Sequence, residues 1–150
     1  MSPANRSMSA HQDTSLATKD LVLAYGERKV INGLSVDIPP GKVSAIVGPN
    51  GCGKSTLLAG LARILAPKSG SVILDGRDIN ALATREVAPK LALLPQDASA
   101  PDGLTVEELI QFGRQPYRSL MRQWSSQDSA IVQAALRATQ LESLAARPLD

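Results

Sequence analysis

The sequence is short of the residues and patterns that mark several protein classes. A single cysteine, Cys52, excludes an intramolecular disulfide and is typical of a reducing compartment. With only four aromatic residues, the core must consist mainly of Leu, Ile, Val and Ala. Sixteen basic against fourteen acidic residues leave a net charge of +2, so no nucleic-acid-binding surface is predicted. No apolar run reaches the ~20 residues of a membrane-spanning helix or the roughly seven of a secretory signal.

The length of 150 residues and an ordinary composition predict one globular domain. Residues 1–15 are small and polar, and we expect them to form a disordered tail before a domain over 16–150. His11, the only histidine, lies in this tail and is interpreted as solvated rather than catalytic.

Period-two alternation from Thr18 to Ile38 predicts two antiparallel strands joined by a turn at 26–28. Residues 42–47 and 91–94 are nearly continuous apolar runs, which is typical of strands buried on both faces of a parallel sheet. Between them, apolar residues at helical spacing from Leu57 to Leu65 predict a helix that stops before Pro67. Residues 71–74 followed by Asp75-Gly76 predict a strand that enters a hairpin.

After Pro101 the pattern is helical throughout. Thr105 and Glu108 form a capping-box pattern before one helix. Ser125 and Asp128 mark the start of a second helix, which carries Ile131, Ala134, Ala135 and Ala138.

The most specific motif is a glycine-rich loop that matches G-x-x-x-x-G-K-[ST], the P-loop. Glycines allow backbone N–H groups to converge on one anion, and the following helix adds its unpaired N–H groups and positive dipole end. We predict that Lys54 reaches the β- and γ-phosphates of a nucleotide and that the Ser55 hydroxyl binds Mg²⁺. The predicted binding residues are Gly48, Pro49, Asn50, Gly51, Cys52, Gly53, Lys54, Ser55 and Thr56.

Two other features have plainer interpretations. Cys52 has no histidine or second cysteine nearby in sequence, so a catalytic or redox role is not favoured. The apolar run that ends at Asp75 is similar to a magnesium-binding Walker B strand, but Gly76 favours a tight turn instead.

The loop wording GPNGCGKSTLL, preceded by LVLAYGERKVINGLSVDIPPGKVSAIV, resembles the ATP-binding subunits of ABC transporters. The resemblance implies an α/β fold, a P-loop NTPase core with an N-terminal antiparallel β-subdomain and a helical subdomain at about 102–147. It implies ATP and Mg²⁺ as cofactors, with Tyr25 stacked on adenine. It also matches Gln96 in LALLPQD to the Q-loop glutamine, which positions water and approaches Mg²⁺.

The stretch Gly113-Arg114-Gln115-Pro116-Tyr117, a GR-x-PY pattern, resembles the ATPases of iron–siderophore, haem and cobalamin importers. That subgroup implies transport-coupled ATP hydrolysis at the cytoplasmic face of the bacterial inner membrane. Its members pair with a second copy and with multi-spanning permease subunits, and indirectly with a periplasmic or lipoprotein substrate-binding protein. The transported chelate is not specified by these residues.

The family's LSGGQ signature, its Walker B Asp-Glu pair and its switch histidine do not occur in the sequence. We therefore expect a fragment truncated before the signature, with an open apolar sheet edge, low stability and no ATPase activity. The alternatives are an ABC-type module that works without a membrane partner, as in DNA repair or translation, and an unrelated P-loop kinase or GTPase. The latter is disfavoured because no N-K-x-D motif occurs.

Overall fold

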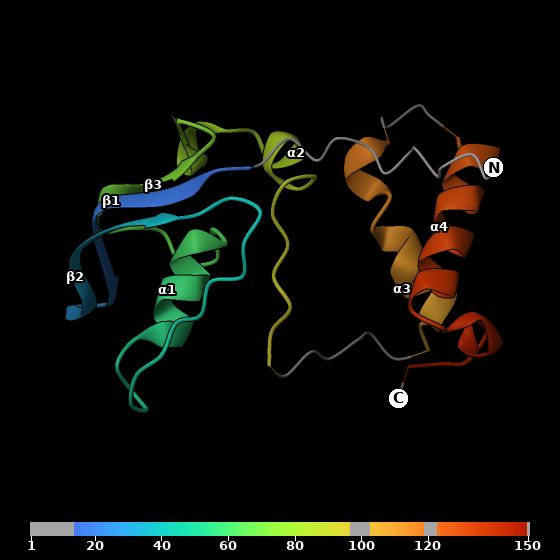
Figure 1. Cartoon of the computed structure of the whole chain (residues 1–150), viewed down its shortest axis with the longest axis horizontal. Coiled ribbons are helices and arrows are strands. Elements are labelled where there is room, and N and C mark those ends of the chain that lie inside the picture. The colour runs from blue at the N-terminus through green and yellow to red at the C-terminus, as the bar shows by residue number, and fades with distance from the viewer. Residues whose placement is uncertain (1–13, 97–102, 119–122, 150) are drawn as a thin grey trace, which may run out of the picture. The chain divides into compact units, whose positions relative to one another are not determined.

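The computed structural model describes residues 14–96, 103–118 and 123–149, which divide into two compact units, one up to Leu91 and one from Ala92 (Figure 1). Most of the predicted tail, residues 1–13 with His11, lies outside the described residues. Ser15, at the end of that predicted tail, exchanges hydrogen bonds with Asp75, 3.0 Å in each direction.

The first unit is built on a four-stranded antiparallel sheet in the order β2-β1-β3-β4. Its strands are β1 (Leu16–Tyr25), β2 (Arg28–Ile38), β3 (Ser69–Leu74) and β4 (Arg77–Asp78). Both predicted hairpins are confirmed: Tyr25 pairs with Arg28, and Leu74 pairs with Arg77. The second turn fits Asp75-Gly76 because both residues have positive φ, 50° and 76°, as a tight hairpin turn requires.

Helix α1 (Lys54–Leu61) packs against this sheet and forms the core with it (Figure 1). The helix buries Leu57 and Leu61 beside the fully buried Leu21 and Leu23 of β1. Each such leucine contributes roughly 1.5–3 kcal/mol to stability. The core is completed by strand β3 and by the segment with η1 (Ile79–Ala81) and α2 (Thr84–Val87), through Val72, Leu74, Ile79, Leu82 and Val87.

Two predictions for the first unit are corrected. The α1 helix ends at Leu61 rather than near Leu65, because Arg63 adopts a left-handed φ of 61° and the Ile64 N–H donates to the Ala59 carbonyl. Residues 43–47 form no strand, and their apolar side chains are exposed, with Val43 at 101% and Val47 at 86%. The cause is the lack of any strand that pairs with this segment within residues 14–96, 103–118 and 123–149.

The strand predicted at residues 91–94 is likewise absent: Leu91, the last residue of the first unit, packs at the edge of its core, whereas Leu94 is 87% exposed. In the second unit, the predicted capping box at Thr105 is confirmed at α3 (Val106–Phe112), and α4 (Ser126–Ala138) starts after Ser125 as predicted, with a capping box of its own. The buried face of α4 differs from the predicted one and consists of Asp128, Val132 and Leu136, spaced four residues apart.

The segment after Pro101 is not wholly helical. Between the two long helices lies η2 (Gln115–Tyr117), and after them η3 (Glu142–Leu144). The last described residues run extended beside the start of α3, where Leu149 N–H donates to Leu104 O at 2.7 Å and Val106 N–H donates to Arg147 O at 3.1 Å.

Candidate functional site

The loop at residues 48–53 has a backbone shape that only glycine adopts at low cost. Gly51 has φ 80° and Gly53, the N-cap of α1, has φ 99°. Gly53 also lies close to β2: a Cβ atom there would stand 3.0 Å from side-chain carbons of both Val30 and Ile31. The sheet therefore fixes the point at which the loop turns into the helix.

The N-terminus of α1 provides backbone donors next to the loop. The helical hydrogen-bond ladder begins with Leu57 N–H donating to Gly53 O at 2.8 Å. The amides of the first turn precede that bond and have no partner within a helix by geometry. Neither a capping side chain nor an acidic residue occupies this first turn, so its positive dipole end is not neutralised by the helix itself.

Lys54 bends back over the loop. Its Nζ donates to Gly48 O at 2.9 Å and to Pro49 O at 2.8 Å. An ammonium group has three donors, so two of them close the loop while the group stays beside the backbone amides. This arrangement fits an anion with several oxygens, because one cation and a row of N–H donors lie together.

The two hydroxyl residues of the motif differ in exposure. Ser55 is exposed, whereas Thr56 is buried with only 7% of its surface exposed. The described residues contain no cluster of three His, Cys, Asp or Glu side chains that could hold a metal ion by themselves. A magnesium ion at this loop fits the Ser55 hydroxyl together with phosphate oxygens and water, as is usual for Mg²⁺.

The remaining predicted site residues lie on the surface. Tyr25 ends β1 with 56% of its surface exposed, on the same hairpin whose second strand carries Val30 and Ile31 beside Gly53. Cys52 is exposed within the loop. Gln96 belongs to the second unit and is exposed.

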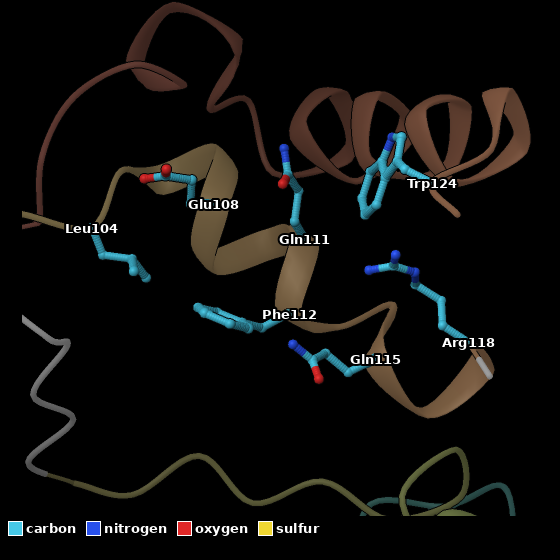
Figure 2. Close-up of a pocket in the computed structure, with 7 residues that line it drawn as sticks. All are labelled: Leu104, Glu108, Gln111, Phe112, Gln115, Arg118 and Trp124. Atoms are coloured by element: carbon cyan, nitrogen blue, oxygen red, sulfur yellow. The ribbon is translucent and has the colours of Figure 1, made fainter. Parts of the chain in front are cut away.

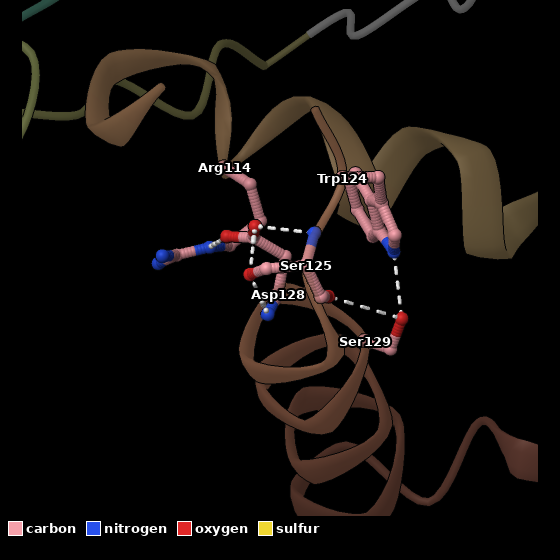
Figure 3. Close-up of polar contacts among 5 residues, drawn as sticks. All are labelled: Arg114, Trp124, Ser125, Asp128 and Ser129. Atoms are coloured by element: carbon pink, nitrogen blue, oxygen red, sulfur yellow. Dashed lines mark hydrogen bonds and ion pairs between the residues drawn. The ribbon is translucent and has the colours of Figure 1, made fainter. Parts of the chain in front are cut away.

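A polar cluster in the second unit was not predicted as such (Figure 3). Asp128 is 2% exposed, and its Oδ1 accepts from Arg114 Nε at 3.0 Å. Its Oδ2 accepts from the Ser125 hydroxyl at 2.6 Å and the Ser125 amide at 3.1 Å. The hydrogen bond from the Ser125 hydroxyl, supported by Arg114 and opposed by burial, lowers the pKa of Asp128 from 3.8 to about 2. The predicted helix start at Ser125 and Asp128 is consistent with the serine contact, but no local signal indicates Arg114.

Beside this cluster lies a cavity of about 210 Å³ (Figure 2). Phe112 and Gln115 line it from α3 and η2, and Trp124 lines it from the residues before α4. Among the residues that the structure describes, no helix combines the length and apolar character needed to cross a bilayer.

The chain is similar in sequence to proteins that are named as ATP-binding proteins of transport systems. The chain is 48% identical over 137 residues to the achromobactin transport ATP-binding protein CbrD of Dickeya dadantii (strain 3937), covering 91% of this chain and 51% of that protein. It is 44% identical over 135 residues to the ferric enterobactin transport ATP-binding protein FepC of Escherichia coli (strain K12), covering 90% and 50%. The chain thus spans about half the length of the curated relatives it matches.

A solved structure described as the ATP-binding subunit of an ABC transporter shares the fold. Its TM-score is 0.72 at 23% identity, over 88% of this chain and 53% of that one. The profile of the ABC transporter family matches residues 31–150, and the chain therefore belongs to the ABC transporter family.

Proposed function

We propose that residues 48–56 bind the triphosphate of ATP together with Mg²⁺, in the nucleotide-binding part of an ABC importer ATPase. The observation that carries this proposal is the position of Lys54, whose Nζ lies 2.9 Å from Gly48 O and 2.8 Å from Pro49 O. An ammonium group so placed meets the β- and γ-phosphates by exchanging these carbonyl oxygens for phosphate oxygens.

The other predicted residues receive roles in the same proposal. The exposed hydroxyl of Ser55 holds Mg²⁺, and the backbone amides of the loop hold phosphate oxygens. Tyr25 stacks on adenine, a contact worth about 1 kcal/mol. Gln96 orients the attacking water and approaches Mg²⁺. Bound MgATP supplies the γ-phosphoryl group whose hydrolysis drives transport.

The proposed cargo is an iron(III)–siderophore or a related metal chelate. Support comes from the names of the relatives, which transport achromobactin and ferric enterobactin, and from the GR-x-PY stretch. The proposed partners are a second copy of the ATPase and multi-spanning permease subunits, with a substrate-binding protein acting indirectly. The ATPase is peripheral, at the cytoplasmic face of the bacterial inner membrane.

A polypeptide of these 150 residues is proposed to bind ATP without turning it over. Its sequence contains no LSGGQ stretch and no Asp-Glu pair, and its only histidine is His11. Hydrolysis needs a carboxylate that polarises water and a second ligand that fixes Mg²⁺. Both are missing from the residues that we place at the site.

Calorimetric titration with MgATP tests the binding proposal. Lys54→Ala removes charge-assisted hydrogen bonds worth about 1.5–3 kcal/mol, so the affinity falls roughly 10- to 150-fold. Lys68→Ala is the matched control, because this lysine forms a surface ion pair with Glu27 at 3.3 Å in the same unit. Binding of equal strength in Lys54→Ala and the wild type, or no binding heat at all in the wild type, contradicts the assignment.

Co-purification separates transport from the alternative function. An importer ATPase is expected to be recovered from membranes together with a multi-spanning permease. An ABC-type module of DNA repair or translation is expected in the soluble fraction, with no such partner.

A further inference from the structure

The Asp128 carboxylate accepts hydrogen bonds from two different segments, the N-cap of α4 and the residue before η2 (Figure 3). Its Oδ2 caps the start of α4 through the amide and hydroxyl of Ser125, at 3.1 and 2.6 Å. Its Oδ1 accepts from Arg114 Nε at 3.0 Å. Both charged side chains are shielded, with 3% of the Asp128 and 17% of the Arg114 side chain exposed. Shielding makes this pair far less sensitive to solvent screening than a surface ion pair.

Arg114 belongs to the GR-x-PY stretch and lies at the start of η2. Its guanidinium also stands over the Tyr117 ring, 4.5 Å from the ring centroid. The guanidinium therefore contacts η2 on one side and the first turn of α4 on the other. The ion pair between Arg114 and Asp128, which we call the Arg114–Asp128 bridge, joins two segments that are 14 residues apart.

Trp124, which precedes α4, is bound to the first turn of that helix through Ser129. The indole Nε1 donates to Ser129 Oγ at 2.6 Å, and the Arg118 guanidinium lies 5.4 Å from the indole ring centroid. Trp124 in turn lines the cavity of about 210 Å³ opposite Phe112 and Gln115 (Figure 2). Arg114 itself does not line that cavity.

We propose that the Arg114–Asp128 bridge is a positioning device that sets the geometry of this cavity. It holds the first turn of α4, and with it Ser129 and Trp124, against η2 and the end of α3. Arg114 of the GR-x-PY stretch thereby determines the position of Trp124 in the cavity wall, although Arg114 itself does not line the cavity. This inference does not depend on nucleotide binding at the P-loop.

Trp124 is the only tryptophan of the 150 residues, so its fluorescence reports on this wall alone. In the full chain, Arg114→Gln breaks the bridge from one side and Asp128→Asn breaks it from the other, while one amide oxygen remains to cap α4. Because Trp124 is only 38% exposed and its side-chain rotamer loses its restraint in either variant, acrylamide quenching rises roughly two- to threefold. Arg137→Gln, which removes a charge from the last turn of α4, leaves quenching unchanged.

The double variant completes the test. If the two residues act as one bridge, Arg114→Gln with Asp128→Asn raises quenching no further than either single change. Far-UV circular dichroism checks that each variant keeps its helix content. If one single variant does not fold, the acrylamide quenching of the other is compared with that of the wild type and of Arg137→Gln. Wild-type quenching in a folded single variant, or additive effects in the double variant, overturns the proposal.

Discussion

The contact between α1 and β1 allows a sharp test of how the P-loop helix is held. Gly60 lies on the buried face of α1, directly over Leu23. A Cβ atom at Gly60 would stand 2.5 Å from Leu23 Cδ1, 3.0 Å from Cδ2 and 3.3 Å from Cγ. The optimum between carbon atoms is about 3.5–4.0 Å, so a methyl group has no room without a shift of α1 or a new leucine rotamer.

The magnitude follows from two opposing effects of Gly60→Ala. Alanine favours the helix over glycine by about 1 kcal/mol. Overpacking a well-filled core costs about 1–3 kcal/mol, and the upper part of that range applies because Leu23 is fully buried and three of its atoms are involved. We expect the free energy of unfolding to fall by about 1–2 kcal/mol, whereas helix propensity alone predicts that it rises by about 1 kcal/mol.

Urea denaturation followed by far-UV circular dichroism measures this change. Leu58→Ala on the exposed side of α1 is the matched control and changes stability by about 0.5 kcal/mol or less. Leu23→Ala alone costs about 2–5 kcal/mol, and Gly60→Ala in that background partly fills the cavity and recovers at least about 1 kcal/mol. A Gly60→Ala protein as stable as the wild type, together with additive energies in the double variant, refutes the packing argument.

Four further outcomes are expected. Ser125→Ala removes the N-cap of α4 and lowers the free energy of unfolding by about 1 kcal/mol in urea denaturation. The folded-state pKa of Asp128 is lowered from 3.8 to about 2, so the ionised carboxylate stabilises the folded state fully above pH 3.8. This contribution to the free energy of unfolding is lost as the pH falls from 3.8 toward 2. Asp128→Asn removes that part of the pH dependence of the urea midpoint. MgATP slows alkylation of the exposed Cys52, and equal rates with and without nucleotide count against the proposed site. The exposed apolar residues 43–47 make the 150-residue polypeptide self-associate, which sedimentation velocity detects; a monomer at all concentrations contradicts this.

Features that depend on local chemistry were predictable from the sequence. The hairpin at Asp75-Gly76, the capping box at Thr105 and the helix start at Ser125 are confirmed, since each depends on residues within about four positions. The pairing of β1 shifts register on both sides of the strand around Asp20, and this irregularity was not predictable, because it depends on a left-handed φ of 47° at Asp20 and on a hydrogen bond from its N–H to Ser35 Oγ in the next strand.

Features that depend on distant partners were missed or misplaced. The apolar run at 43–47 predicts a buried strand, but a strand is defined by the neighbour that pairs with it, and no described strand does so. The contact between Arg114 and Asp128 has no local pattern, since an arginine before a Gln-Pro-Tyr turn is equally compatible with a solvated side chain. In both cases the local sequence does not identify the partner: the apolar run at 43–47 is exposed without one, and Arg114 is shielded because it has one.

The same distinction explains how the phosphate loop keeps its shape. The segment before it, residues 43–47, is unpaired, so the loop receives no support from that side within the described residues. The support comes from the other side: Gly53 lies against β2, Lys54 closes on Gly48 and Pro49, and α1 rests on Leu23. The downstream half of the loop is thus determined by the antiparallel sheet. For the phosphate site that we propose at the start of α1, the main support among the described residues is therefore the contact between α1 and that sheet.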